Sequence, residues 1–225
     1  MEITLYHGSE KIVERPQFGA GRPTTDYGSG FYCTENCELA KEWACSEGNS
    51  GFANQYRISL EGLSVMNLNS ENYNTLNWLA ILLENRTFGL RTLLAIEARK
   101  FILSRFLPDY KSADVMIGYR VDDSYFSCCR AFMGNVITLE QLRRAMKLGG
   151  LGDQIVLKSR TAFRRIVFEK AQPADENIYY PLYAARDRSA RGEFEKILSE
   201  DDPREGSYMI DIIRQNWKND DPRLL

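Results

Sequence analysis

The chain is nearly devoid of histidine, with a single imidazole at His7 among 225 residues. One histidine excludes a two-histidine nuclease site, a His-x-x-x-His metal clamp and a multi-histidine zinc centre. His7 follows a short apolar stretch and precedes Gly8 and Ser9. A strand that ends in His-Gly-Ser can present one side chain and backbone amides at the rim of a cleft. Any histidine chemistry in this protein therefore belongs to His7.

Other features are also missing. The net charge of −2 gives no global basic field for nucleic acid. The five cysteines form no Cys-x-x-Cys pair, which argues against a zinc site or a disulfide framework and fits a reducing compartment. The N-terminus lacks a signal-peptide pattern, and no window has the ~20 apolar residues of a membrane span. We expect a cytoplasmic protein with no membrane partner and no metal ion.

Nucleotide-binding glycine motifs are absent too. No Gly-x-Gly-x-x-Gly follows a strand and opens a helix, and there is no Walker pattern. Gly28-Ser29-Gly30 is too short for a dinucleotide fingerprint and precedes a strand instead of a helix.

Hydrophobic periodicity predicts short strands at both ends of the region before Pro173, with helices between them. Expected strands cover 3–7, 31–34, 55–60, 63–68, 113–118, 154–159 and 162–168; expected helices begin near Asn36 and cover 72–86, 90–107, 138–148, 176–199 and 206–217. This order favours an α+β fold over a repeated βαβ unit. We expect a domain over 1–172 and a charged C-terminal helical extension over 173–225, packed on or beside the core.

Several segments together resemble a known enzyme superfamily. They are His7-Gly8-Ser9, Arg22-Pro23, Gly28-Ser29-Gly30-Phe31-Tyr32, Ala40-Lys41-Glu42-Trp43-Ala44, Trp78-Leu79, Asn85-Arg86, Asp114-Val115-Met116-Ile117-Gly118 and Asp122-Asp123. In that order they resemble a bacterial family of ADP-ribosyltransferase-like proteins, in the branch related to poly(ADP-ribose) polymerases and diphtheria toxin. The resemblance covers residues 3 to about 168 and implies a split β-sheet core with a helical insertion.

The resemblance also implies roles around NAD, the co-substrate. His7 would hydrogen-bond the adenosine ribose, Gly8 would offer its backbone to the nicotinamide carboxamide, and Ser9 belongs to the same cofactor-binding segment. Tyr32 and Trp43 would sandwich the nicotinamide ring, where stacking contributes about 0.5–1.5 kcal/mol beyond burial. Arg22 would meet the pyrophosphate as a charge-assisted donor; it equally fits an ordinary surface arginine.

Gln154 stands where the family has its catalytic glutamate. A glutamine can hydrogen-bond a ribose hydroxyl, but it has no negative charge and cannot act as a base. Asp153 should point to the opposite strand face. Asp122 and Asp123 are candidates for the missing carboxylate and equally fit the charged start of a helix. A Cys33 or Cys128 nucleophile paired with His7 is a further alternative.

The resemblance and the chemistry of these residues together predict mono-ADP-ribosyl transfer from NAD to a protein or nucleic acid, with Gln154, His7 and Tyr32 as the catalytic residues. The bacterial family implies a toxin or defence effector, with a small antitoxin as a partner. The first alternative is an NAD glycohydrolase, in which water is the acceptor. The second is a non-catalytic module that binds NAD or ADP-ribose.

Overall fold

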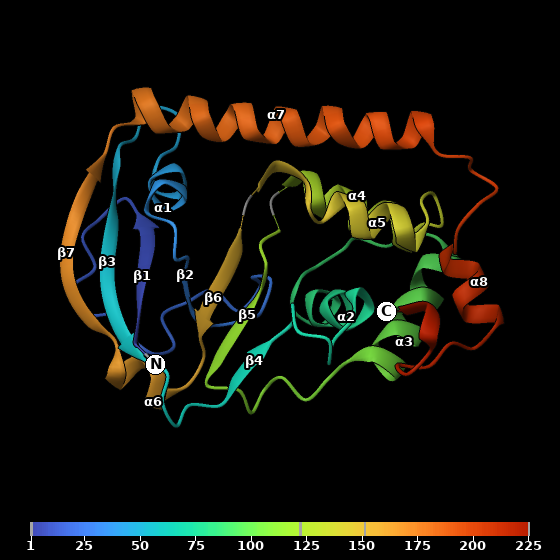
Figure 1. Cartoon of the computed structure of the whole chain (residues 1–225), viewed down its shortest axis with the longest axis horizontal. Coiled ribbons are helices and arrows are strands. Elements are labelled where there is room, and N and C mark those ends of the chain that lie inside the picture. The colour runs from blue at the N-terminus through green and yellow to red at the C-terminus, as the bar shows by residue number, and fades with distance from the viewer. Residues whose placement is uncertain (1, 122, 151, 225) are drawn as a thin grey trace.

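The computed structural model describes residues 2–121, 123–150 and 152–224 and has a mixed α+β architecture. Figure 1 shows two small sheets side by side, a group of helices beyond the second sheet, and one long helix lying across both parts. In the described part of the chain, no helix combines the length and apolarity that a membrane crossing requires.

The first sheet has three antiparallel strands in the order β1-β3-β7, formed by Glu2–Ser9, Gly51–Ser59 and Val167–Ala174. Strand β1 lies at its edge, and a backbone bridge between Tyr6 and Thr34 links it to the end of the second sheet. Strand β7 continues to Ala174, past the expected domain boundary at residue 172.

The second sheet has the order β2-β6-β5-β4, formed by Phe31–Cys33, Asp153–Leu157, Val115–Tyr119 and Val65–Asn67. Only the β4–β5 pair is parallel among these strands. A parallel pair needs a crossover, and helices α2, Thr75–Asn85, and α3, Leu93–Phe106, supply it.

Apolar clusters cover both faces of the central part of the second sheet. On one face, Leu5, Phe31 and Ile155 belong to an apolar cluster between the two sheets. On the other face, Met116 and Val156 pack against a larger cluster built mainly from helices. These helices include α4, Asp123–Met133; α5, Leu139–Ala145; and α8, Met209–Arg214; short 3₁₀ turns cover Leu148–Gly150 and Pro222–Leu224.

Helix α7, Glu176–Glu200, lies across the molecule above α1, Cys37–Ala44, and above α4 and α5 (Figure 1). Its Arg186 forms a two-point ion pair with the buried Glu42 of α1, at 3.0 Å from Nε and 2.7 Å from Nη2. The C-terminal helix therefore contacts the element that carries Trp43.

The expected strand over 162–168 is wrong. Residues Arg160–Arg165 form helix α6, and β7 begins only at Val167. The Ser159 side chain accepts a hydrogen bond from the Ala162 backbone N–H at 3.1 Å and caps this helix. The apolar residues Ala162 and Phe163 pack from that single helical turn onto the cluster between the sheets.

Candidate functional site

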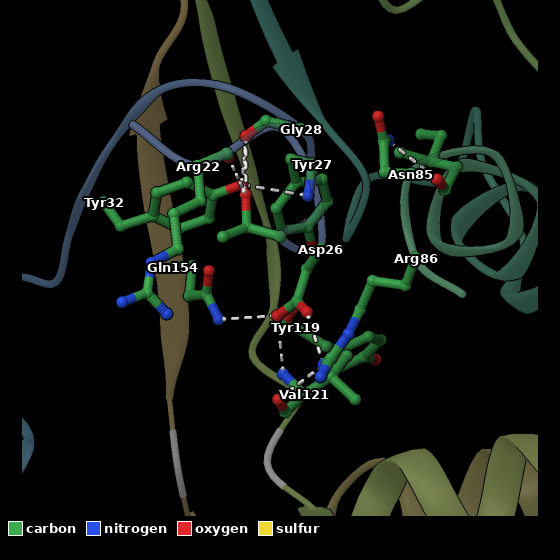
Figure 2. A network of polar contacts seen from close by, with 12 residues as sticks. Arg22, Asp26, Tyr27, Gly28, Tyr32, Asn85, Arg86, Tyr119, Val121 and Gln154 are labelled. Carbon is green, nitrogen blue, oxygen red and sulfur yellow. Dashed lines mark hydrogen bonds and ion pairs between the residues drawn. The ribbon is translucent and has the colours of Figure 1, made fainter. Parts of the chain in front are cut away.

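Four of the predicted site residues line one cavity of about 340 Å³. The lining consists of Arg22, Thr24, Thr25, Asp26, Tyr32, Trp43, Arg86, Arg120, Val121 and Gln154. These residues come from the loop before β2, from β2, from α1, from the end of α2, from the segment after β5 and from β6. Figure 2 shows the part of this site around Asp26. The fold thus brings Arg22, Tyr32, Trp43 and Gln154 together at one cavity.

Strand pairing explains why Tyr32 and Gln154 meet. Tyr32 pairs with Val156 between β2 and β6, and Gln154 lies two residues from Val156, so its side chain is on the same face. The neighbouring Asp153 is exposed and accepts a hydrogen bond from the Asn69 side chain at 2.8 Å. The expectation that Asp153 points away from Gln154 is confirmed.

Asp26 is a buried carboxylate among the lining residues and has polar partners on both sides (Figure 2). Its Oδ1 accepts from Arg86 Nη1 at 2.9 Å, and its Oδ2 accepts from Val121 N and Gln154 Nε2, each at 3.1 Å. Burial raises the pKa of Asp26, while the Arg86 guanidinium and the two other donors act in the opposite direction. These contacts join four separate chain segments.

Among the side chains that the structure describes, two buried polar atoms have no hydrogen-bond partner: Trp43 Nε1 and Gln154 Oε1. Both residues line the cavity. A buried polar atom without a partner costs about 1–3 kcal/mol, and native proteins keep few of them. One atom is a donor and the other an acceptor, so the pair is suited to a ligand that offers both kinds of group.

The Tyr32 hydroxyl is engaged by the turn before its own strand. It donates to Gly28 O at 2.7 Å, accepts from Tyr27 N at 3.0 Å and lies 2.7 Å from Thr25 Oγ1. Burial raises the pKa of this phenol, so it stays protonated. Tyr32 therefore contributes its ring to the cavity, and its hydroxyl holds the loop that carries Asp26.

Trp43 lies at the end of α1, directly against β1. A methyl group added to Gly8 would lie 2.0 Å from Ala40 O and 3.0 Å from Trp43 Cβ, so only glycine permits this approach. The Arg120 guanidinium covers one face of the Trp43 ring, 3.9 Å from its centre. Such a cation–π contact leaves the opposite ring face for other groups.

His7 and its neighbours lie beside the cavity; as far as the chain is described, the lining does not include His7, Gly8 or Ser9. The Nδ1 of His7 lies 2.7 Å from Tyr32 O. A carbonyl oxygen only accepts, so Nδ1 carries the hydrogen and Nε2 remains an acceptor. Burial lowers the pKa of the imidazole, which favours this neutral form. Its ring packs on Phe31, with ring centres 4.3 Å apart.

The backbone N–H and C=O of Gly8 point away from β3. Tyr6 exchanges backbone hydrogen bonds with Thr34, and alternation along an antiparallel strand directs Gly8 to the same side, away from β3. The Ser9 hydroxyl donates to Lys11 O at 2.7 Å and accepts from Asn54 Nδ2 at 3.0 Å. Ser9 thus stabilises the turn that leaves β1.

The remaining candidates are two aspartates and two cysteines. Asp122 lies outside the described residues, and Asp123 is the first residue of α4. The Cys33 and Cys128 thiols are buried, and burial raises the pKa of each, that of Cys128 to about 11. Both sulfurs therefore remain protonated near neutral pH and are poor nucleophiles.

Sequence reasoning missed three charged residues of the cavity: Asp26, Arg86 and Arg120. Arg86 lies within a segment that carries the resemblance, and Asp26 lies two residues before another, but nothing in the sequence links either residue to Gln154. Arg120 follows the strand that ends near Gly118, a position typical of binding residues.

The sequence profile of a protein family described as a protein of unknown function, DUF3990, matches residues 3–168, well over half of the chain. No curated protein and no solved structure matches the chain.

Proposed function

Because the chain belongs to the DUF3990 family, whose description assigns no activity, its function is inferred from its own site, and we propose that it transfers one ADP-ribosyl group from NAD to a macromolecule. The observation that carries this proposal is the pair of unpartnered buried atoms, Trp43 Nε1 and Gln154 Oε1, on residues that line one cavity. A nicotinamide riboside offers a carboxamide and ribose hydroxyls, which supply both acceptors and donors.

Charge in the cavity supports an anionic ligand with this chemistry. Three arginines, Arg22, Arg86 and Arg120, line it together with a single described carboxylate, Asp26, which is paired with Arg86. Guanidinium groups bind phosphate oxygens through charge-assisted, often bidentate hydrogen bonds. The pyrophosphate of NAD would contact Arg22 and Arg120, and this would draw the Arg120 guanidinium off the Trp43 ring.

The proposal includes an ADP-ribosyltransferase-like core, and two features of the fold support it. His7 and Gly8 lie on the edge strand of one sheet, while Tyr32 and Gln154 share a face of the other. Helices α2 and α3 form the insertion between β4 and β5. NAD would lie along the junction, with the carboxamide at the Gly8 backbone and the adenosine ribose at His7 Nε2.

In the reaction, the bond between the ribose C1 and the nicotinamide nitrogen breaks, and its electron pair leaves with the neutral nicotinamide. The ribose carbon becomes oxocarbenium-like, as in glycoside cleavage. A nucleophile of the acceptor attacks this carbon and loses its proton to solvent. Gln154 would hold a ribose hydroxyl through Oε1 and direct its carbonyl dipole at the developing cation. Because Gln154 cannot take a proton, the acceptor must be activated in another way, which favours single transfer over chain elongation.

The test is release of nicotinamide from NAD, measured by chromatography with a cell lysate as the source of acceptors. Gln154→Met and Tyr32→Ala should reduce release at least tenfold. Gln172→Met on β7, outside the cavity lining, should retain it. Label retained on macromolecules supports transfer, whereas free ADP-ribose alone would indicate a glycohydrolase. NAD binding with no nicotinamide release would indicate a binding module.

The same resemblance implies that the activity is toxic to bacterial cells and is held in check by a small antitoxin. Induced expression in a bacterial host should arrest growth, and Gln154→Met should relieve the arrest. Equal growth arrest by both proteins would separate toxicity from the proposed chemistry.

A further inference from the structure

Gln154 is 5% exposed, and with the described residues its side chain makes one hydrogen bond, from Nε2 to Asp26 Oδ2 at 3.1 Å. Its Oε1 has no partner. An amide has two different ends, one a donor and one an acceptor. The end of the Gln154 amide that hydrogen-bonds to the protein determines whether a donor or an acceptor remains for a ligand.

An ionised carboxylate only accepts hydrogen bonds, so Asp26 can be met by the NH₂ end of Gln154 and by no other part of the amide. Asp26 is itself fixed from two further sides, by Arg86 Nη1 at 2.9 Å and by Val121 N at 3.1 Å. Arg86 is held in turn by the Phe126 ring, 4.5 Å from its guanidinium carbon. Figure 2 shows Asp26 between Gln154 and Arg86. The carboxylate therefore cannot turn away without leaving buried donors unpaired.

We propose that Asp26 is a positioning residue that orients the Gln154 amide, so that the site presents an acceptor and selects a ligand carrying a hydroxyl at that point. This inference rests on the proposed function for the identity of the ligand, a ribose of NAD. The orientation itself is a property of the protein without ligand. Where the family that the sequence resembles has a glutamate, this chain would use a neutral amide oxygen that the Asp26 carboxylate holds in place.

The first arm of the test needs no ligand. Gln154→Glu puts a second carboxylate against Asp26, and two adjacent buried carboxylates cannot both ionise without cost. We expect the melting temperature to fall by about 5 °C. In the double variant Asp26→Asn with Gln154→Glu, an amide again donates to a carboxylate, and part of the loss should be recovered; Val121 N, which shares Oδ2 with Gln154, loses its acceptor. Asp201→Asn, which removes another Asp–Arg pair at Arg144 outside the cavity, is the control and should not rescue Gln154→Glu.

The second arm measures binding of NAD and of an analogue that lacks the 2′-hydroxyl of the nicotinamide ribose, by calorimetry. Wild type should prefer NAD by about tenfold, because the analogue leaves Oε1 unpaired. In Asp26→Asn, the charged Arg86 keeps the amide oxygen, and the NH₂ end takes the place of Oδ2. This leaves Val121 N without its acceptor and inverts the Gln154 amide. The preference should then fall to about twofold, and Asp26→Asn with Gln154→Glu should restore it.

The two arms separate the two proposals. Rescue of the melting temperature without any NAD binding by wild type would support the positioning role and contradict the proposed function. NAD binding by wild type with the same hydroxyl preference in Asp26→Asn, and additive melting shifts, would overturn the positioning role alone.

Discussion

Trp43 on α1 and Gln154 on β6 line the same cavity, and each carries one buried polar atom without a partner, an N–H donor on Trp43 and a carbonyl acceptor on Gln154. In the described part of the chain they are the only two buried side-chain polar atoms without a hydrogen-bond partner. Such atoms destabilise a fold unless a ligand satisfies them.

Trp43→Phe keeps an aromatic ring and removes the Nε1 donor. We expect NAD affinity to fall about tenfold, because one ligand hydrogen bond is lost, and the melting temperature to stay unchanged or to rise slightly. Trp217 is the control: it also has an arginine over its ring, and its Nε1 donates to Gln215 Oε1 at 3.1 Å, whereas the buried Nε1 of Trp43 has no partner. Trp217→Phe should lower the melting temperature and leave NAD affinity intact. The reverse pattern would contradict the assignment of Trp43.

Gly8→Ala tests the close approach of α1 to β1. The new methyl group would lie 2.0 Å from Ala40 O and 2.9 Å from Ala44 N, both backbone atoms, so the helix that carries Trp43 must shift. We expect a lower melting temperature together with loss of NAD binding in calorimetry. Gly192→Ala on α7 is the control, because nothing lies within 4 Å of its added carbon. It should stabilise the helix by about 0.5–1 kcal/mol. Normal NAD binding by Gly8→Ala would show that Trp43 does not depend on this contact.

The single imidazole leads to a prediction about how the free energy of unfolding depends on pH. Burial lowers the pKa of His7 below its ordinary value of 6.5. The folded state therefore binds fewer protons than the unfolded state, and the free energy of unfolding should decrease as the pH falls below 6.5 toward the folded pKa. NMR of the His7 ring protons should show titration below pH 6.5. In His7→Gln the stability should change less between pH 7.5 and 5.5. A ring that titrates above 6.5 would contradict the buried, neutral form.

The C-terminal helix α7 is predicted to stabilise α1 through Arg186. Removing that guanidinium in Arg186→Met leaves the Glu42 carboxylate, 3% exposed, without its two-point partner. We expect a loss of about 3 kcal/mol, or about 6–12 °C in melting temperature. Lys196→Met, which removes an exposed pair with Glu200 on the same helix, should cost about 0.5 kcal/mol or less. Equal effects of the two variants would mean that the buried pair does not hold α7.

Local signals predicted the elements that carry the site. The short apolar stretch before His7, the helix start expected near Asn36 and the apolar run after Gln154 correspond to β1, α1 and β6. The α6 turn was not predicted, because an apolar run of this length fits a strand equally well and only the Ser159 cap separates the two.

The hydrogen-bond network around Asp26 could not be predicted from the sequence, for a different reason. Asp26 and Gln154 are 128 positions apart, and their meeting depends on where the loop before β2 lies relative to β6. A carboxylate in a glycine-rich loop has no pattern that distinguishes a buried acceptor from a solvated one. Arg120 and Trp43 likewise meet only through the packing of α1 beside the end of β5.

The most direct test of the central claim is a crystal structure of the full chain with NAD. We predict the nicotinamide riboside in the cavity, with Trp43 Nε1 and Gln154 Oε1 each hydrogen-bonded to it and the pyrophosphate on Arg22 and Arg120. NAD bound elsewhere, or a cavity that stays empty at saturating NAD, would contradict the account.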